Sequence, residues 1–210
     1  MKTSTRTYKL HGFTPLLGTQ PANPDVRTAY IASKGVKEGV DVSDEERMAA
    51  ASAEQESGIT VFLGDPDADD ALSLMDYMVK GFFKEGINAL EAELNVKQAA
   101  SKVDKYLFVE PRVIHIERHG APILQEDMVL ERPLRAKTMQ GERVTLTASE
   151  RINDPWEISF TVTLVENNGT SKSASVKWEA VEAALDYGRL KGLGQWRNGG
   201  WGRFNWERID

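Results

Sequence analysis

Apolar and polar residues alternate in short stretches along much of the chain, a pattern typical of half-buried β-strands. Thr7–Phe13 shows this pattern near the start and Trp201–Trp206 shows it near the end. Proline or glycine separates most of the stretches between them, which favours an antiparallel sheet over alternating β–α–β units. The other predicted strands are Ile59–Leu63, Leu72–Tyr77, Tyr106–Val109, Arg112–Glu117, Asp127–Glu131, Arg143–Thr147 and Ile158–Val165.

Two longer stretches carry apolar residues at the spacing of an α-helix. These are Met78–Leu94, with six apolar residues on one face, and Ala180–Leu190, with four. Gly81 and Gly86 interrupt the first stretch at a cost of about 1 kcal/mol each relative to alanine. We therefore expect a neighbouring segment or a ligand to pack closely against them. Shorter helices are predicted over Asn23–Ile31, Ser43–Glu56 and Lys97–Asp104.

This order of strands and helices predicts one α+β domain over residues 1–210, built on an antiparallel sheet with packed helices. Residues 34–70 differ from the rest because they are polar and acidic. From Glu38 to Asp70 there are eleven acidic residues and one basic residue, Arg47. That segment carries −10, and the remainder carries +4 within a total of −6. We expect an acidic insertion or mobile loop within a mildly basic body.

Composition narrows the class of protein. The chain has no cysteine, which excludes disulfides and thiolate metal sites and fits an intracellular protein. It contains no run of eighteen apolar residues, so no membrane span is expected. The N-terminal residues lack the apolar core of a signal peptide.

The stretch Gly188–Phe204 concentrates six glycines, four cations and two tryptophans within seventeen residues. Glycine permits close approach of the backbone to another group, while arginine and tryptophan offer fixed charge and flat faces to phosphates and bases. This chemistry suits a nucleic-acid backbone. The same composition also suits a tight connection between a helix and the last strand, with Trp196 or Trp201 capping a core.

A second cationic stretch runs from Arg132 to Arg151. It contains five basic and two acidic residues, which gives it a net charge of +3. A hairpin with this charge could straddle a phosphate backbone. Alternatively, its charges could protect an exposed sheet edge from pairing with another chain.

Candidate catalytic residues are few. His11, His115 and His119 are the three histidines, so a histidine acid or base has to be one of them. The chain contains no phosphate-binding loop, dinucleotide fingerprint or nucleophile elbow. Four aspartates between residues 65 and 76 have calcium-loop spacing, but that loop lacks its glycine and its final glutamate. We therefore predict no catalytic residue, no metal site and no cofactor.

Three segments resemble the RAMP superfamily of CRISPR effector subunits. Asp76–Glu85 resembles the place where a Lys-Gly pair opens a helix, and Thr14–Leu17 resembles the end of the first strand. Gly192–Gly194 with Gly200–Phe204 resembles the glycine-rich loop before the last strand. The resemblance implies a ferredoxin-like or RRM-like core in which the sheet, two helices and the loop hold single-stranded nucleic acid. The acidic segment and the lack of a histidine beside the loop depart from that pattern and count against RNA cleavage.

The whole chain also resembles a family encoded in bacterial prophages. The shared words are Ile31–Lys34, Glu131–Ala136 and Gly192–Asn198. That family lends no function, but the resemblance implies a phage protein in the cytoplasm of a bacterial host.

The expected function is non-enzymatic binding of single-stranded DNA or RNA in a groove lined by the glycine-rich cationic loop. Self-association along the strand or contact with another phage protein would accompany it. One alternative is a RAMP-like endoribonuclease using His11 or His115. Another is a protein-interaction module or inhibitor that mimics a CRISPR effector subunit. The residues expected to contact nucleic acid are Lys80, Lys84, Arg132, Arg135, Lys137, Arg143, Lys191, Gln195, Trp196, Arg197, Trp201 and Arg203.

Overall fold

The computed structural model describes residues 2–22, 59–138, 141–166 and 176–210. Between residues 134 and 145 it describes strand backbone but not side chains. The predicted helices Asn23–Ile31 and Ser43–Glu56 therefore lie outside the described residues, as does most of the acidic segment. Its last part, from Ile59, enters strands of two sheets.

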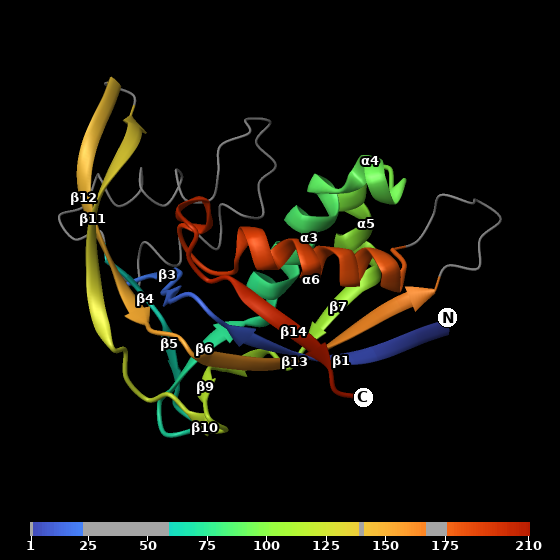
Figure 1. Cartoon of the computed structure of the whole chain (residues 1–210), viewed down its shortest axis with the longest axis horizontal. Coiled ribbons are helices and arrows are strands. Elements are labelled where there is room, and N and C mark those ends of the chain that lie inside the picture. The colour runs from blue at the N-terminus through green and yellow to red at the C-terminus, as the bar shows by residue number, and fades with distance from the viewer. Residues whose placement is uncertain (1, 23–58, 139–140, 167–175) are drawn as a thin grey trace.

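The described residues form mainly antiparallel sheets with packed helices, and the predicted α+β class is confirmed (Figure 1). In chain order the elements are β1 (Lys2–Gly12), β2 (Leu16–Leu17), β3 (Gln20–Pro21), β4 (Ile59–Val61), β5 (Leu63–Asp65), β6 (Ala71–Met75), α3 (Asp76–Ala89), α4 (Glu91–Leu94), α5 (Ala99–Tyr106), β7 (Leu107–Glu110), β8 (Val113–His115), β9 (Glu117–Arg118), β10 (Ala121–Pro122), β11 (Met128–Thr138), β12 (Gly141–Ile152), β13 (Trp156–Glu166), α6 (Trp178–Lys191), η1 (Arg197–Gly199) and β14 (Phe204–Arg208).

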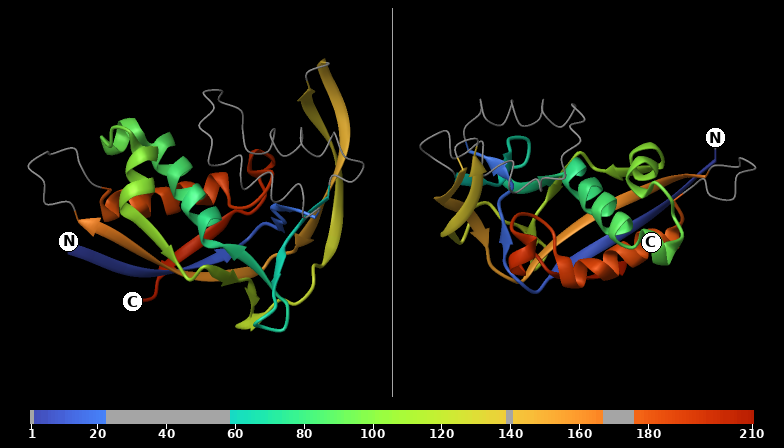
Figure 2. Two further views of the ribbon diagram at one scale, coloured as in Figure 1. Left: turned by 180° about the vertical axis from the view of Figure 1, so that it is seen from behind. Right: turned by 90° about the horizontal axis from the view of Figure 1, so that it is seen from above.

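The largest sheet has the order β10-β9-β13-β1-β14, and β7 also pairs with β13. β1 pairs with β13 along its whole length, with Tyr8 opposite Phe160. On its other side it pairs with β14, with Leu10 opposite Trp206. Elements from opposite ends of the chain therefore lie side by side, with α3 and α6 on one face of the sheet (Figure 2).

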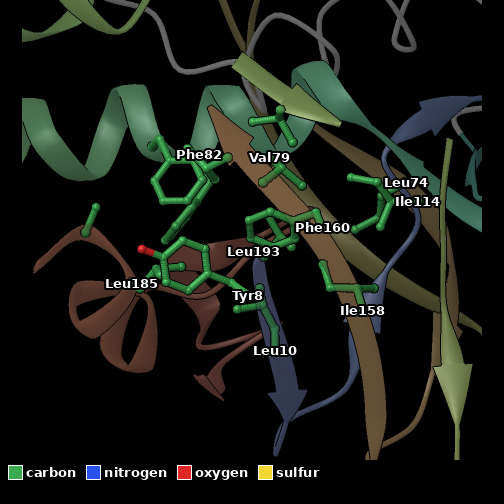
Figure 3. Close-up of a cluster of buried hydrophobic side chains, with 14 of the residues drawn as sticks. Tyr8, Leu10, Leu74, Val79, Phe82, Ile114, Ile158, Phe160, Leu185 and Leu193 are labelled. Carbon is green, nitrogen blue, oxygen red and sulfur yellow. The ribbon is translucent and has the colours of Figure 1, made fainter. Parts of the chain in front are cut away.

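The core lies between this sheet and helices α3 and α6. Along β13, buried and half-buried residues alternate, as the pattern in Ile158–Val165 predicts, so every second side chain faces the helices. Burial of this apolar surface is the main favourable term in folding. Figure 3 shows members of the cluster: Tyr8, Leu10, Leu74, Val79, Phe82, Ile114, Ile158, Phe160, Leu185 and Leu193.

The two glycines of α3 have different surroundings. At Gly86 an added Cβ would lie 3.1 Å from the Cβ of Ala184 in α6, so the predicted close packing is confirmed there. At Gly81 no described residue lies within 4 Å of the corresponding position, so no described segment packs closely there. The helix also begins at Asp76 rather than Met78. The Asp76 carboxylate accepts the Tyr77 backbone N–H at 2.7 Å, which suits an acid at a helix N-terminus.

A second sheet has the order β11-β12-β4-β3, and β2 also pairs with β12. Its long hairpin β11–β12 projects from the rest of the molecule (Figures 1 and 2). The predicted strands Asp127–Glu131 and Arg143–Thr147 are the two arms of this hairpin, but both arms are longer than predicted. Pro133 does not end β11, because an edge strand tolerates proline where a central strand does not.

Candidate nucleic-acid interface

The segment between α6 and β14 folds back on itself. The Leu193 side chain is buried in the core, and its backbone N–H donates to the Gly202 carbonyl oxygen at 2.9 Å. The Gly202 N–H in turn donates to the Pro15 carbonyl oxygen at 2.8 Å. The predicted strand Trp201–Trp206 is therefore wrong over its first half. With a φ of 69°, Gly202 turns away from a strand path, and β14 begins at Phe204.

Two glycines allow this fold-back. A Cβ on Gly192 would collide with the Trp201 carbonyl oxygen, and a Cβ on Gly202 would collide with the Leu193 carbonyl oxygen. Both glycines also have positive φ, 83° and 69°, which glycine adopts at little cost. The close backbone approach expected from the sequence is made here to the protein's own chain, which gives the loop a defined shape.

Two tryptophans of this loop stack on each other between two arginines of the hairpin. The rings of Trp196 and Trp201 are inclined by 15°, with centroids 6.0 Å apart. The guanidinium carbon of Arg132 lies 4.4 Å from the Trp196 centroid, and that of Arg151 lies 5.3 Å from the Trp201 centroid. Both are cation–π distances. We refer to Arg132, Trp196, Trp201 and Arg151 as the Arg–Trp column.

The hairpin register sets the order of the column. Arg132 of β11 lies opposite Thr147 of β12, and Arg151 follows on the same face because side chains alternate along a strand. The step from Thr147 to Arg151 spans about 13 Å, which leaves room for both indoles between the guanidinium groups. Arg151 was not among the residues expected to bind. The sequence shows that Arg151 and Thr147 are four residues apart and so share a face of one strand. Placing Arg151 on the same face as Arg132 requires the register of the two strands.

Arg203 lies beside this column. Its backbone N–H donates to Thr14 Oγ1 at 2.8 Å, and its guanidinium group packs over Gly200, 3.4 Å from where a Cβ would stand. The Nε atoms of Arg203 and Arg151 are buried. Within the described ranges these two Nε atoms have no hydrogen-bond partner. Two arginines therefore flank the loop, and Arg151 lies near enough to Asp127 to help lower the pKa of that carboxyl.

The other two predicted cations of the loop are held by α3. Glu85 forms ion pairs with Arg197 at 2.6 Å and with Lys191 at 3.3 Å. The Lys191 ammonium also donates to Asn198 Oδ1 at 2.6 Å. The charge of these two residues is therefore partly compensated, and the contacts tie the loop to the helix.

Lys80 and Lys84 turn toward α5. The Lys84 ammonium pairs with the Asp104 carboxylate at 2.7 Å, and the Lys80 ammonium donates to the Asp104 carbonyl oxygen at 3.1 Å. Lys80 also lies 5.0 Å from the Phe108 ring centroid. The structure does not bring these two lysines together with the Arg–Trp column.

The remaining predicted residues lie along the hairpin and within the loop. Arg135 and Lys137 are in the outer part of β11. Arg143 is in β12, opposite Ala136 of β11. The structure does not describe the side chains of these three basic residues. Gln195 is buried next to Trp196. The hairpin backbone thus extends the line of basic residues beyond the column.

The histidines are engaged with carboxylates or lie in a turn. His11 lies between Glu157 and Glu207, at 3.1 and 3.0 Å. His115 of β8 meets Asp65 at 2.7 Å, and this contact is the main cause that lowers the pKa of Asp65. His119 has a φ of 54° in the turn before β10. The calcium-loop aspartates diverge, since Asp76 pairs instead with Arg112 at 3.0 Å.

Within residues 2–22, 59–138, 141–166 and 176–210, no group of three or more histidines and acids is arranged to hold a metal ion. In the same ranges no helix has both the length and the apolar character needed to cross a membrane.

No protein-family model matches the chain, and no curated protein sequence does. Among solved structures, the chain is similar to one chain in a cryo-electron microscopy structure of the type III-B Cmr-β complex bound to cognate target RNA. The two chains are 9% identical with a TM-score of 0.43, and the match covers 98% of this chain. It spans 60% of the length of the other chain.

Proposed function

We propose that this protein binds single-stranded nucleic acid at the surface formed by the Arg–Trp column and Arg203, and that it does so without catalysing a reaction. The observation that supports the proposal is the meeting of β11, β12 and the glycine-rich loop. The loop is distant in the sequence from this hairpin, and together they bring three arginines beside two half-buried indoles. Guanidinium groups recognise phosphate, and indoles stack on bases.

The pairing of the cations ranks the proposed contacts. The Nε atoms of Arg151 and Arg203 have no hydrogen-bond partner among the described residues, and a phosphate beside these guanidinium groups would supply an acceptor. Lys191 and Arg197 already have Glu85 as their partner. The proposed path therefore starts at the column and continues along the hairpin toward Arg143, rather than toward the lysines of α3.

The number of contacts sets the expected dependence on salt. For a single strand, the logarithm of affinity falls with the logarithm of salt concentration by about 0.7 for each phosphate contact. Arg132 is 5% exposed and is not counted. Arg151 and Arg203 predict a slope of about −1.4, and participation of Arg135, Lys137 and Arg143 would bring it to about −3.5. Stacking contributes about 1–3 kcal/mol for each base. We therefore expect binding that weakens with salt but does not rest on charge alone.

Fluorescence anisotropy with labelled oligonucleotides tests this proposal. RNA, the ligand of the complex described above, is compared with single-stranded DNA of the same sequence and with the duplex, over a series of salt concentrations. We expect binding of single strands with a slope in the stated range. No binding to any form at low salt, or binding insensitive to salt, would contradict the proposal.

Catalysis and protein partners are tested separately. RNA that stays intact after long incubation with excess protein in chelator supports binding without cleavage, whereas cut RNA would favour the endoribonuclease. We also propose that the protein is of phage origin and associates with itself along the strand or with another phage protein. A partner recovered by pull-down when no oligonucleotide binds would favour the interaction module instead.

A further inference from the structure

The two indoles of the Arg–Trp column are nearly parallel plates that do not fully cover each other. Atoms of planes in direct contact lie about 3.5–4.0 Å apart, whereas the Trp196 and Trp201 centroids are 6.0 Å apart. The rings are therefore either displaced sideways or separated. In both cases part of each inner face is not covered by the other ring. Both side chains are also only partly buried.

The backbone holds the plates in place. Trp196 has a φ of 53°, a conformation that costs a residue with a side chain about 1–3 kcal/mol and persists only where its surroundings fix it. The Trp196 carbonyl oxygen accepts the Gly199 N–H at 2.9 Å, within a short 3-10 turn. A Cβ on Gly199 would lie 3.1 Å from both indoles, so glycine leaves room beside the two rings. The pair is thus pre-formed by the loop.

The outer ends of the column are already occupied. Arg132 covers Trp196 and Arg151 covers Trp201, so the outer faces are less available to a base than the inner ones. A planar base between the indoles needs ring planes about 7 Å apart, twice the contact distance of stacked atoms. If the rings are displaced sideways and in contact, their planes have to part by about 3.5 Å, one ring thickness, to admit a base.

We propose that Trp196 and Trp201 form a clamp that sandwiches one nucleobase, with Arg132 and Arg151 closing its two ends. This inference rests on the proposed binding of single strands and deepens it, because it makes the base, and not only the phosphate backbone, a ligand of this site. The clamp takes any of the bases, since stacking uses the flat face that all of them share.

Two oligonucleotides with the same sugar–phosphate backbone test the clamp. One is a thymidine oligomer of about 10 nucleotides, within the range of site sizes known for single-strand binders, and the other has abasic positions throughout. We expect the thymidine oligomer to bind about 10- to 100-fold more tightly and to quench tryptophan fluorescence. Equal affinity for both oligomers would overturn the clamp and leave the proposed function standing. No binding of either oligomer would overturn both.

Substitutions locate the effect. Trp196→Ala and Trp201→Ala should each reduce the affinity for the thymidine oligomer toward that for the abasic one, while the phenylalanine variants retain most of it. Trp178→Ala is the matched control. Trp178 is also a partly exposed indole covered by an arginine, with Arg6 at 4.5 Å, but it lies at the other end of α6. Loss of the preference for bases in Trp178→Ala, or its persistence in folded Trp196→Ala and Trp201→Ala, would contradict the clamp. If the alanine variants do not fold, the affinities of the unaltered protein for the two oligomers still test the clamp.

Discussion

The guanidinium group of Arg197 and the carboxylate of Glu85 form a 2.6 Å ion pair that joins the glycine-rich loop to α3. Glu85 also pairs with Lys191, so one carboxylate compensates two cations of the proposed interface. Glu85→Gln should remove this negative charge from beside both cations and raise the affinity for a single strand about 2- to 5-fold at low salt. The gain should vanish at high salt because it is electrostatic.

The control for this substitution is Asp104→Asn. It frees Lys84 on the side of α3 that faces α5, where we expect no nucleic acid. Anisotropy titrations measure the change in affinity for a single strand in each of the two variants. An equal gain in both would mean that general charge, and not this loop, governs binding.

Arg151 and Arg203 should carry phosphate contacts. Replacing both by glutamine removes two charges without emptying the space they fill, so the slope of the salt dependence should become shallower by about 1.4. Affinity at low salt should fall correspondingly. Lys84→Gln provides the comparison, since this lysine already has an acid partner and lies away from the column. An unchanged slope in the double variant would remove these two arginines from the interface.

Two helical glycines should respond in opposite directions to alanine. Gly81→Ala should raise the free energy of unfolding by up to about 1 kcal/mol, because the helix gains propensity and nothing lies near the added methyl group. Gly188→Ala in α6 should lower it by about 1–3 kcal/mol, because the methyl group would collide with the buried Phe204 ring. Urea unfolding of both variants measures the difference. Stabilisation by both substitutions would contradict the packing of α6 on β14.

The pair Arg118–Asp127 should make stability depend on pH. Its two nearest atoms are 2.6 Å apart, and the same carboxylate accepts the Asn153 backbone N–H at 2.6 Å. The contact with Arg118 is the main cause that lowers the pKa of Asp127. A lowered pKa in the folded state adds stability above the ordinary aspartate pKa, and this is lost as pH falls through the folded value.

Asp127→Asn should therefore lower the free energy of unfolding by about 1–2 kcal/mol at neutral pH. The difference from the unaltered protein should shrink below about pH 4. Thermal unfolding across this range measures it, with Glu110→Gln, an exposed carboxyl on β7, as the reference. A difference that stayed constant with pH would mean that the carboxylate charge is not responsible.

Local patterns predicted most strands and the two long helices. An apolar residue at every second position indicates a strand, and one at every third or fourth position indicates a helix. They did not predict where α3 ends. Leu90 continues the apolar spacing of the helix, yet its backbone leaves helical geometry, with a φ of −99° and a ψ of 13°. Trp201 likewise continues a strand-like alternation, and the hydrogen bond from Gly202 to Pro15 overrides it. A tertiary contact therefore decides where β14 begins.

The candidate site was predicted in part. Trp196, Trp201 and Arg203 came from the composition of the loop, and Arg132 came from the charge of the hairpin. Arg151 could not be chosen without the register that places it on the same face as Arg132. The sequence also did not predict the partner of Lys80 and Lys84, because Asp104 contacts them from a different helix, α5. Whether the selected residues contact nucleic acid stays a prediction.

Pairing of β1 with β14 has a consequence for synthesis of the protein. Tyr8 lies opposite Arg208, so β1 waits for a strand that is translated about 200 residues later. The Pro15 carbonyl likewise waits for Gly202. Contacts of such long sequence separation form late, so a nascent chain on the ribosome cannot assemble the tryptophan pair until β14 has emerged. Polypeptides released before that point should carry the hairpin arginines without the aromatic surface they face.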